Sequence, residues 1–275
     1  MKRVGERMVI TKNLANHLEK TEIKMFESRL NAIKEIQNNA MGVEVGQFDG
    51  AYAFTVKNIP GPSYNVVKGD SFSSENTIDQ ILSFYKEREI PARFDLAPQY
   101  ANAISLQKLH NAGLYQSDFH ATLYCELNEE MVGRTKDSPI KIRQINEAEF
   151  DCYGNIYVEG FGMPTFLAES VTANNKVLYD KPGWSFYIAS LQGEDVGIGS
   201  LYINDGTAIL AASAVMPKAR SQGIHQALIQ FRINEALQQN CSVMIGHAKF
   251  ASISQNNMER CGLRMATKSI WTEIK

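Results

Sequence analysis

The sequence predicts a mixed α/β (α+β) protein made of two lobes. Its hydrophobic residues change repeatedly between helical spacing and the alternating spacing of strands. The order of the elements in the first half of the chain recurs in the second half. The segment NAISLQKLHNAGL, which ends at Gly113-Leu114, also matches FASISQNNMERCGL, which ends at Gly262-Leu263, without gaps. A chance match of two glycine-capped helices is the alternative, but the shared element order favours a duplicated lobe.

The first lobe is expected to span residues 1–130. Residues 23–37 repeat hydrophobic side chains at helical spacing, and Asp49-Gly50 is a hairpin turn signal between two runs of strand-like residues. The expected strands are 43–47, 52–57, 63–69, 92–96 and 114–124, and the further helices are 77–89 and 102–111.

The second lobe is expected to span residues 139–275, after the polar stretch 129–139 that we interpret as a linker. It is predicted to begin with a strand at 140–145 and a helix at 147–159. The later strands are expected at 184–191, 196–203, 207–215, 242–248 and 264–274, and the later helices at 223–239 and 252–261.

Composition and charge limit the kinds of partner. The 275 residues are 44% hydrophobic and 21% charged, which is typical of a globular protein with a sizeable core. The formal net charge of -2 and a pI near 6.2 argue against nucleic-acid binding, which normally requires a basic surface. We therefore expect a small-molecule or peptide partner.

The sequence also argues against export, membrane insertion and metal binding. The N-terminal residues lack the apolar core of a secretory signal, and no apolar run approaches the ~20 residues that span a bilayer. The four cysteines form no C-x-x-C pair, and the five histidines show no H-E-x-x-H spacing. We expect a cytoplasmic protein with free thiols and no metal site.

Residues 211–231, AASAVMPKARSQGIHQALIQF, carry the strongest chemical signal. An apolar strand ends at Met216, Pro217 prevents its continuation, and a loop with Arg220 and Gly223 opens into a long helix. The first N–H groups of a helix lack internal partners, so such a loop can bind a phosphate or pyrophosphate. A purely structural strand–loop–helix turn is the alternative. The spacing is not that of a P-loop, and Gly197 and Gly199 lack the third glycine of a dinucleotide fingerprint.

This segment resembles the GNAT superfamily of acetyl-CoA-dependent N-acetyltransferases. The family carries Arg/Gln-x-x-Gly-x-Gly/Ala after its fourth strand, often preceded by Val-x-Pro, and this chain has VMP at 215–217 followed by RSQGIH at 220–225. The ending NNMERCGL at 256–263 is similar to the family's later helix and its closing glycine. The resemblance covers residues 140–275 in element order, and it implies a mixed, mostly antiparallel sheet flanked by helices in each lobe.

The resemblance further implies that acetyl-CoA is the co-substrate and that its acetyl group passes to an amine by direct attack in a ternary complex. No cysteine nucleophile is then required. The residues implied in binding acetyl-CoA are Val215, Met216, Arg220, Ser221, Gln222, Gly223, Ile224, His225, Gln226 and Asn256.

Two residues depart from the family pattern. His225 stands where the family prefers Gly or Ala, so its side chain must point away from the pyrophosphate. Met258 stands where the family often has a tyrosine that protonates the departing thiolate, and a thioether cannot donate a proton. Ser254, another residue, water or bulk solvent would have to supply that proton.

The first lobe resembles the same fold without the loop. At the offset of the repeat, Arg220 and Gly223 correspond to Ser71 and Ser74, which provide neither charge nor close backbone approach. We therefore expect a degenerate first lobe and one acetyl-CoA site per chain, in the second lobe.

Candidate catalytic groups are fewer. His247 ends the strand at 242–248 and is a candidate general base, although a histidine at a strand end more often packs or caps there. Glu159 and Glu169 flank the segment GFGMPTFL and could bind the amine, or they are ordinary surface residues. Five aromatic residues are either core or acceptor-pocket lining: Phe161, Phe166, Trp184, Phe186 and Tyr187.

Two other functions stay open. A CoA-responsive regulatory protein of the same fold would retain the loop without turnover, and the loop could instead bind a different phosphate ligand. The acceptor amine and the oligomeric state cannot be inferred from the sequence.

Overall fold

The computed structural model describes residues 8–59, 61, 63–70, 76–132 and 138–273, and it divides into two compact units. Unit 1 comprises the chain up to Val9 and residues Leu123–Met265; unit 2 comprises Ile10–Thr122 and the chain from Ala266. These limits differ from the expected ranges 1–130 and 139–275, because the final strand belongs with the first half of the chain. The reason is its pairing, since Ser269 lies opposite Leu96 in an antiparallel register. That residues 1–130 are a degenerate copy of the second lobe stays a prediction, and Ser71 and Ser74 lie outside the described residues.

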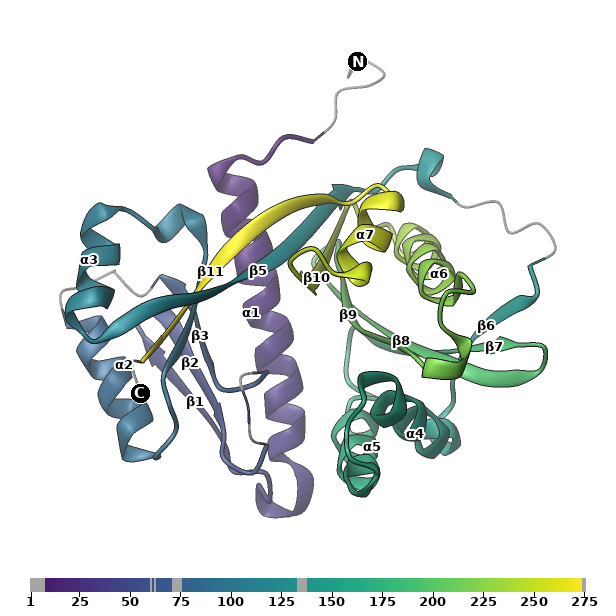
Figure 1. The fold of residues 1–275 in the computed structure, drawn as a ribbon, viewed down its shortest axis with the longest axis horizontal. Helices are drawn as coiled ribbons and strands as arrows, with labels where there is room; N and C mark the ends of the chain where they lie inside the picture. Colours follow the sequence, from purple (N-terminus) through teal and green to yellow (C-terminus); the bar gives the residue numbers. More distant parts are fainter. Residues whose placement is uncertain (1–7, 60, 62, 71–75, 133–137, 274–275) are drawn as a thin grey trace. The chain divides into compact units, whose positions relative to one another are not determined.

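Unit 2 is a mixed sheet with helices on its two faces. Its strands are β1 (Val43–Phe48), β2 (Gly50–Val56), β3 (Val66–Asp70), β4 (Arg93–Leu96), the end of β11 (Arg264–Glu273) and the start of β5 (Leu114–Glu126). Its helices are α1 (Lys12–Lys34), α2 (Thr77–Glu87) and α3 (Ala103–Asn111) (Figure 1). Helix α1 begins well before the expected residue 23, because Thr11 caps it by accepting a hydrogen bond from the Leu14 N–H at 3.2 Å.

A buried ion-pair cluster lies on the α1 face of this sheet. We define it as Glu19 and Glu22 of α1, Lys68 of β3, Asp95 of β4 and Lys268 of β11. The Lys68 ammonium is 2.7 Å from the Glu22 carboxylate and 2.5 Å from that of Asp95, and Lys268 is 2.5 Å from Glu19. Burial alone would raise the pKa of Asp95, but the two lysines hold it well below its ordinary value. Asp95 therefore stays ionised, and the cluster ties four elements together.

Unit 1 has a sheet in the order β5, β10, β9, β8, β7, β6. Its strands are the end of β5, β6 (Ile140–Gln144), β7 (Trp184–Leu191), β8 (Glu194–Asn204), β9 (Thr207–Val215) and β10 (Val243–Lys249). Strands β6 to β9 are antiparallel neighbours, whereas β9 and β10 are parallel. The expectation of a mixed, mostly antiparallel sheet flanked by helices is confirmed.

Four helices cover this sheet: α4 (Phe150–Phe161), α5 (Ala168–Lys176), α6 (Ile224–Gln238) and α7 (Ile253–Arg260) (Figure 1). Consecutive residues of a strand point to opposite faces. Ala214 faces α4, because a Cβ on Gly160 would lie 2.7 Å from the Ala214 Cβ, whereas Val215 packs in a cluster with Ile224 of α6. Helices α4 and α6 therefore lie on opposite faces of β9.

Among the described residues, no helix combines the length and the apolar character that crossing a membrane would require. In the same part of the chain, no three His, Cys, Asp or Glu side chains are grouped so as to hold a metal ion.

Candidate functional site

Strands β9 and β10 part from each other within the sheet of unit 1. They pair in parallel over four positions, from Thr207 opposite Val243 to Leu210 opposite Gly246. Beyond this point β9 continues to Val215 and β10 to Lys249 without further pairing to each other among the described residues. The ladder between β9 and β10 no longer uses the main-chain groups along this opening, so those that no side chain occupies can meet a ligand.

A β-bulge lies at the start of the opening. Leu201 of β8 lies opposite Leu210, but Ser200 lies opposite Ala212, so Ala211 is an extra residue on β9. A bulge bends its strand and re-aims the residues that follow, and bulges are frequent beside active sites. Ala211, Ala212 and Ser213 are partly exposed, whereas the residues before and after them on β9 are buried.

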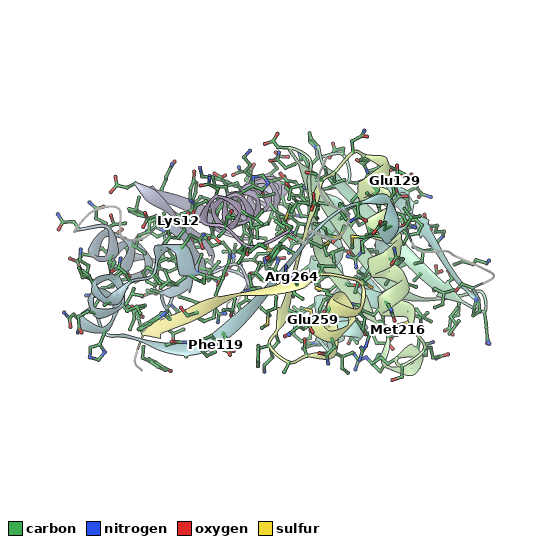
Figure 2. All side chains as sticks on the ribbon, turned by 90° about the horizontal axis from the view of Figure 1, so that it is seen from above. Lys12, Phe119, Glu129, Met216, Glu259 and Arg264 are labelled. Atoms are coloured by element: carbon green, nitrogen blue, oxygen red, sulfur yellow. The ribbon has the colours of Figure 1, made fainter. Side chains whose placement is uncertain are left out.

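The loop after β9 leads directly into the N-terminus of α6. Pro217 begins a single turn of 3-10 helix, and Ser221 (φ 62°) and Gly223 (φ 80°) then adopt the left-handed conformation. A Cβ added to Gly223 would meet no heavy atom within 4 Å. The space above the loop is open, and the first N–H groups of α6 have no partners within the helix. This geometry suits an anion held by backbone amides. Figure 2 marks Met216, the residue between β9 and this loop.

Arg220 fixes the loop to the end of α4. Its guanidinium donates hydrogen bonds to the Gly160 carbonyl at 2.7 Å and to the Val215 carbonyl at 3.3 Å. The Arg220 side chain therefore fixes the position of the loop and also keeps a positive charge beside it. Lys218, on the same loop, forms an ion pair with Glu194.

The side chain of His225 points toward α7. Its Nδ1 is 3.1 Å from the Asn257 amide nitrogen. Burial, together with the nearby charge of Arg232, lowers the pKa of His225 to about 4, so the imidazole is neutral at physiological pH. Asn256, the predicted ligand contact on α7, is exposed, and its neighbour Asn257 is the residue that reaches the N-terminal turn of α6.

His247 and Met258 lie near the opening on the β10 side. His247 is one residue beyond the last paired position of β10 and is partly exposed. Met258 is 4% exposed and lies so close to β10 that a Cβ on Gly246 would be 2.6 Å from its sulfur. Met258 therefore packs α7 against the strand.

The remaining candidates divide between surface and core. Glu159 and Glu169 are exposed. Of the five aromatic candidates, three are in the core and two are exposed. The buried ones are Trp184, Phe186 and Tyr187, and the exposed ones are Phe161 (49%) and Phe166 (80%).

Sequence reasoning missed Arg232, which is fully buried beneath the bulge. From α6 it donates hydrogen bonds to the carbonyls of Ser200 at 2.9 Å and Ala212 at 2.8 Å. Gly199 leaves room for it, since a Cβ there would lie 3.2 Å from the guanidinium carbon. An arginine flanked by apolar residues on a helix, together with glycines inside a strand, is the only sequence signal of this arrangement.

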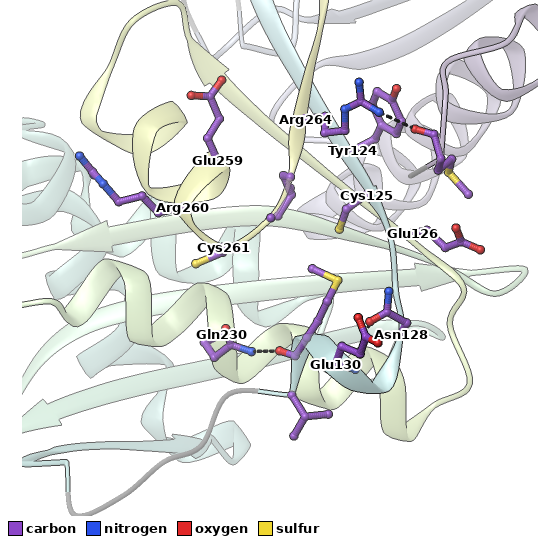
Figure 3. Close-up of a pocket in the computed structure, with 15 residues that line it drawn as sticks. Tyr124, Cys125, Glu126, Asn128, Glu130, Gln230, Glu259, Arg260, Cys261 and Arg264 are labelled. Carbon is purple, nitrogen blue, oxygen red and sulfur yellow. Dashed lines mark hydrogen bonds between the residues drawn. The ribbon is translucent and has the colours of Figure 1, made fainter. Parts of the chain in front are cut away.

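A cavity of about 740 Å³ opens elsewhere in unit 1, between the end of β5, α6 and the end of α7 (Figure 3). Its described lining includes Gln230, Arg260 and Cys261, but neither the residues of the loop after β9 nor His247. Burial raises the pKa of its Cys125 thiol to about 12, which makes that cysteine a poor nucleophile. Nothing about this cavity requires covalent catalysis.

Comparisons with known proteins agree with this geometry. Residues 142–263 match the family model described as "Acetyltransferase (GNAT) family". A GCN5-related N-acetyltransferase from Kribbella flavida superposes with a TM-score of 0.61 at 12% identity, over 90% of this chain and 96% of that one. One from Sphaerobacter thermophilus gives 0.61 at 12% identity, over 97% and 94%. A functionally unknown conserved protein from Staphylococcus epidermidis gives 0.61 at 15% identity, over 88% and 98%. No curated protein matches the sequence significantly.

Proposed function

We propose, from the premise that residues 142–263 form a domain of the GNAT acetyltransferase family, that this chain transfers an acetyl group from acetyl-CoA to an amine. The observation that carries the proposal is the sequence of features along β9. The strand bulges at Ala211, parts from β10 after Leu210, and ends in a loop that presents the N-terminus of α6.

Binding would use the loop and the open strand. Backbone N–H groups of residues 221–226 would hold the pyrophosphate, because the helix macrodipole and the unpaired amides favour an anion there. The open space at Gly223 fits such a group. The His225 side chain does not block it, since the imidazole is turned toward Asn257.

The exposed edge of β9 would hold and polarise the thioester. An N–H donor near Val215-Met216 is the family's usual oxyanion partner, and a fixed donor of this kind stabilises the charge that develops on the carbonyl oxygen. Acceptance of the amine proton by His247 fits its position beside the opening. A neutral imidazole nitrogen has a lone pair with which it can accept that proton.

Release of the thiolate would proceed without a proton from Met258. Its thioether has no proton to give, and the side chain is used in packing against Gly246. The proton would come from Ser254, from another group or from solvent.

The ion-pair cluster supports a single site per chain. Val66 of β3 corresponds to Val215 of β9 in the sequence repeat, and β3 and β4 pair in parallel at one position, Val67 opposite Phe94. Beside that position the gap holds Lys68 and Asp95, and the Gly69 N–H donates to Glu19 at 3.0 Å. A glutamate side chain thus occupies a main-chain N–H of β3 beside this pairing, which leaves that N–H unavailable to an anion.

Isothermal titration with acetyl-CoA, followed by an assay of free thiol release over a panel of amines, tests the proposal. Binding with stoichiometry near one and acceptor-dependent thiol release are expected. Saturable binding without thiol release for any amine would favour the second candidate, a CoA-responsive regulatory protein, which the non-donating Met258 suggests. Absence of binding would contradict both.

A further inference from the structure

We propose that Arg232 is a positioning residue that holds the bulged segment of β9 in the conformation that binds the thioester. This inference rests on the proposed function. It is carried by the contacts of one buried cation with main-chain oxygens of both strands, β8 and β9, at the bulge.

The hydrogen bonds of Arg232 join three elements. Its Nε donates to the Leu228 carbonyl of α6 at 2.9 Å, and its Nη1 donates to Ser200 of β8 at 2.9 Å and to Ala212 of β9 at 2.8 Å. Ser200 and Ala212 are the pair that lies immediately beyond the extra residue Ala211. The guanidinium therefore accounts for the carbonyls at the point where the ladder is interrupted.

Such a contact is costly for a purely structural role. Arg232 is 0% exposed, and its acceptors in the described part of the chain are carbonyl oxygens and not carboxylates. Burial lowers its pKa to about 10, so it is still charged at neutral pH. Burying a charge without a carboxylate partner has a desolvation cost of several kcal/mol, which an apolar side chain of similar size would avoid.

The position of Arg232 indicates which function offsets the desolvation cost of burying its charge. The loop at Gly223 leads into the N-terminus of α6. Arg232 lies on the same helix, more than two turns further along, and donates a hydrogen bond to Ala212 of β9. Arg232 thereby ties the helix that carries the loop to the bulged segment of β9, which is one wall of the opening. The cation also places positive potential along the main chain where charge would develop on the thioester oxygen.

Three variants test the inference. Arg232→Met removes all three donors, and Arg232→Lys keeps the charge without the planar set of donors. Ile233→Ala is the matched control, because Ile233 is also fully buried on α6 and its loss destabilises the helix without removing these bonds. If Arg232→Met does not fold, Arg232→Lys is measured in its place.

Amide hydrogen exchange of peptides that cover residues 207–216 is measured with acetyl-CoA titrations of the same proteins. For the Arg232 variants we expect faster exchange in that peptide and acetyl-CoA binding that is weaker by roughly tenfold or more. The reason is the loss of the two charge-assisted hydrogen bonds to Ser200 and Ala212. Ile233→Ala should change neither the exchange of this peptide nor the acetyl-CoA affinity beyond what its overall loss of stability explains. Unchanged exchange at 207–216, or faster exchange with unaltered acetyl-CoA affinity, would overturn the inference. If the unaltered chain binds no acetyl-CoA, the proposed function fails, while the exchange data still decide whether Arg232 holds the bulge.

Discussion

Replacement of Gly223 by valine tests two requirements at this position: a left-handed backbone conformation and open space for the pyrophosphate. The residue has φ 80° and, with a Cβ, would contact no heavy atom within 4 Å. The left-handed conformation costs an L-residue about 1–2 kcal/mol, and a branched Cβ adds bulk where the pyrophosphate is proposed to lie. Gly193 offers a matched control, with φ 86° and equally open surroundings on the turn between β7 and β8.

The expected magnitudes follow from that comparison. Both valine variants should lower the melting temperature by roughly 2–8 °C, at about 2–4 °C for each kcal/mol in a domain of this size. Only Gly223→Val should lose acetyl-CoA affinity. Loss of one hydrogen bond to a charged group, at about 1.5–3 kcal/mol, corresponds to roughly 10- to 100-fold.

Differential scanning fluorimetry and isothermal titration with acetyl-CoA measure the two quantities on the same samples. A Gly223→Val protein that melts like Gly193→Val and binds acetyl-CoA as tightly as the unaltered chain would refute the assignment of the loop. Equal loss of affinity in both variants would show that strain alone, and not the position of the residue, is responsible.

Four further predictions concern the site and its supports. Arg220→Ala should abolish or weaken a single acetyl-CoA site, as isothermal titration would report; a second site that survives the change would contradict the one-site account. Met258→Leu should change turnover little and cost under ~1.5 kcal/mol of stability, because the residue only packs; a large loss of turnover in a stable protein would mean that α7 lies elsewhere relative to the thioester. Lys268→Met should cost about 3–5 kcal/mol in urea unfolding at pH 7, since it removes the lysine of Glu19 and leaves the ammonium of Lys68 as the cluster's one cation for three buried carboxylates. That cost should shrink as the pH falls below about 4, because the stability that the depressed pKa of Asp95 provides is complete above the unfolded value and is lost progressively below it; a cost that is the same at low pH would argue against ion pairing. Finally, the His225 ring should titrate near pH 4 in NMR spectra assigned with His225→Gln, and stability should fall between about pH 6.5 and 4 because the unfolded chain binds the proton more readily; titration near 6.5 would show that the ring is exposed.

Periodicity and turn signals were sufficient for most strands and for the family resemblance, which is confirmed. They failed at the first half of α1, where residues 12–22 are largely polar. Glu19 and Glu22 are buried there because lysines from β3 and β11 pair with them, and no local pattern can show a partner that lies far along the chain. Helix α5 was missed for a related reason, since its buried residues are Asn174 and Asn175.

The candidate site was predicted in part. The loop at 217–223 was found because proline, arginine and glycine mark it locally. The bulge at Ala211 and the contact of Arg232 depend on the register between β8 and β9, which the alternation of residues along one strand does not determine. The partner of His225 likewise depends on how α6 and α7 pack together.

The pairing of the last strand, β11, with β4 affects how this protein folds during its synthesis. Strand β4 acquires its second neighbour, β11, only when residues 266–273 have been synthesised, about 150 residues after the rest of unit 2. At about 5–20 residues per second, the edge of β4 would wait roughly 8–30 s on the ribosome. An unpaired strand edge can pair with other chains during that interval. Early arrest of translation, or proteolytic removal of the last ten or so residues, should therefore leave the amino-terminal half prone to aggregate even though its own helices and hairpins are complete.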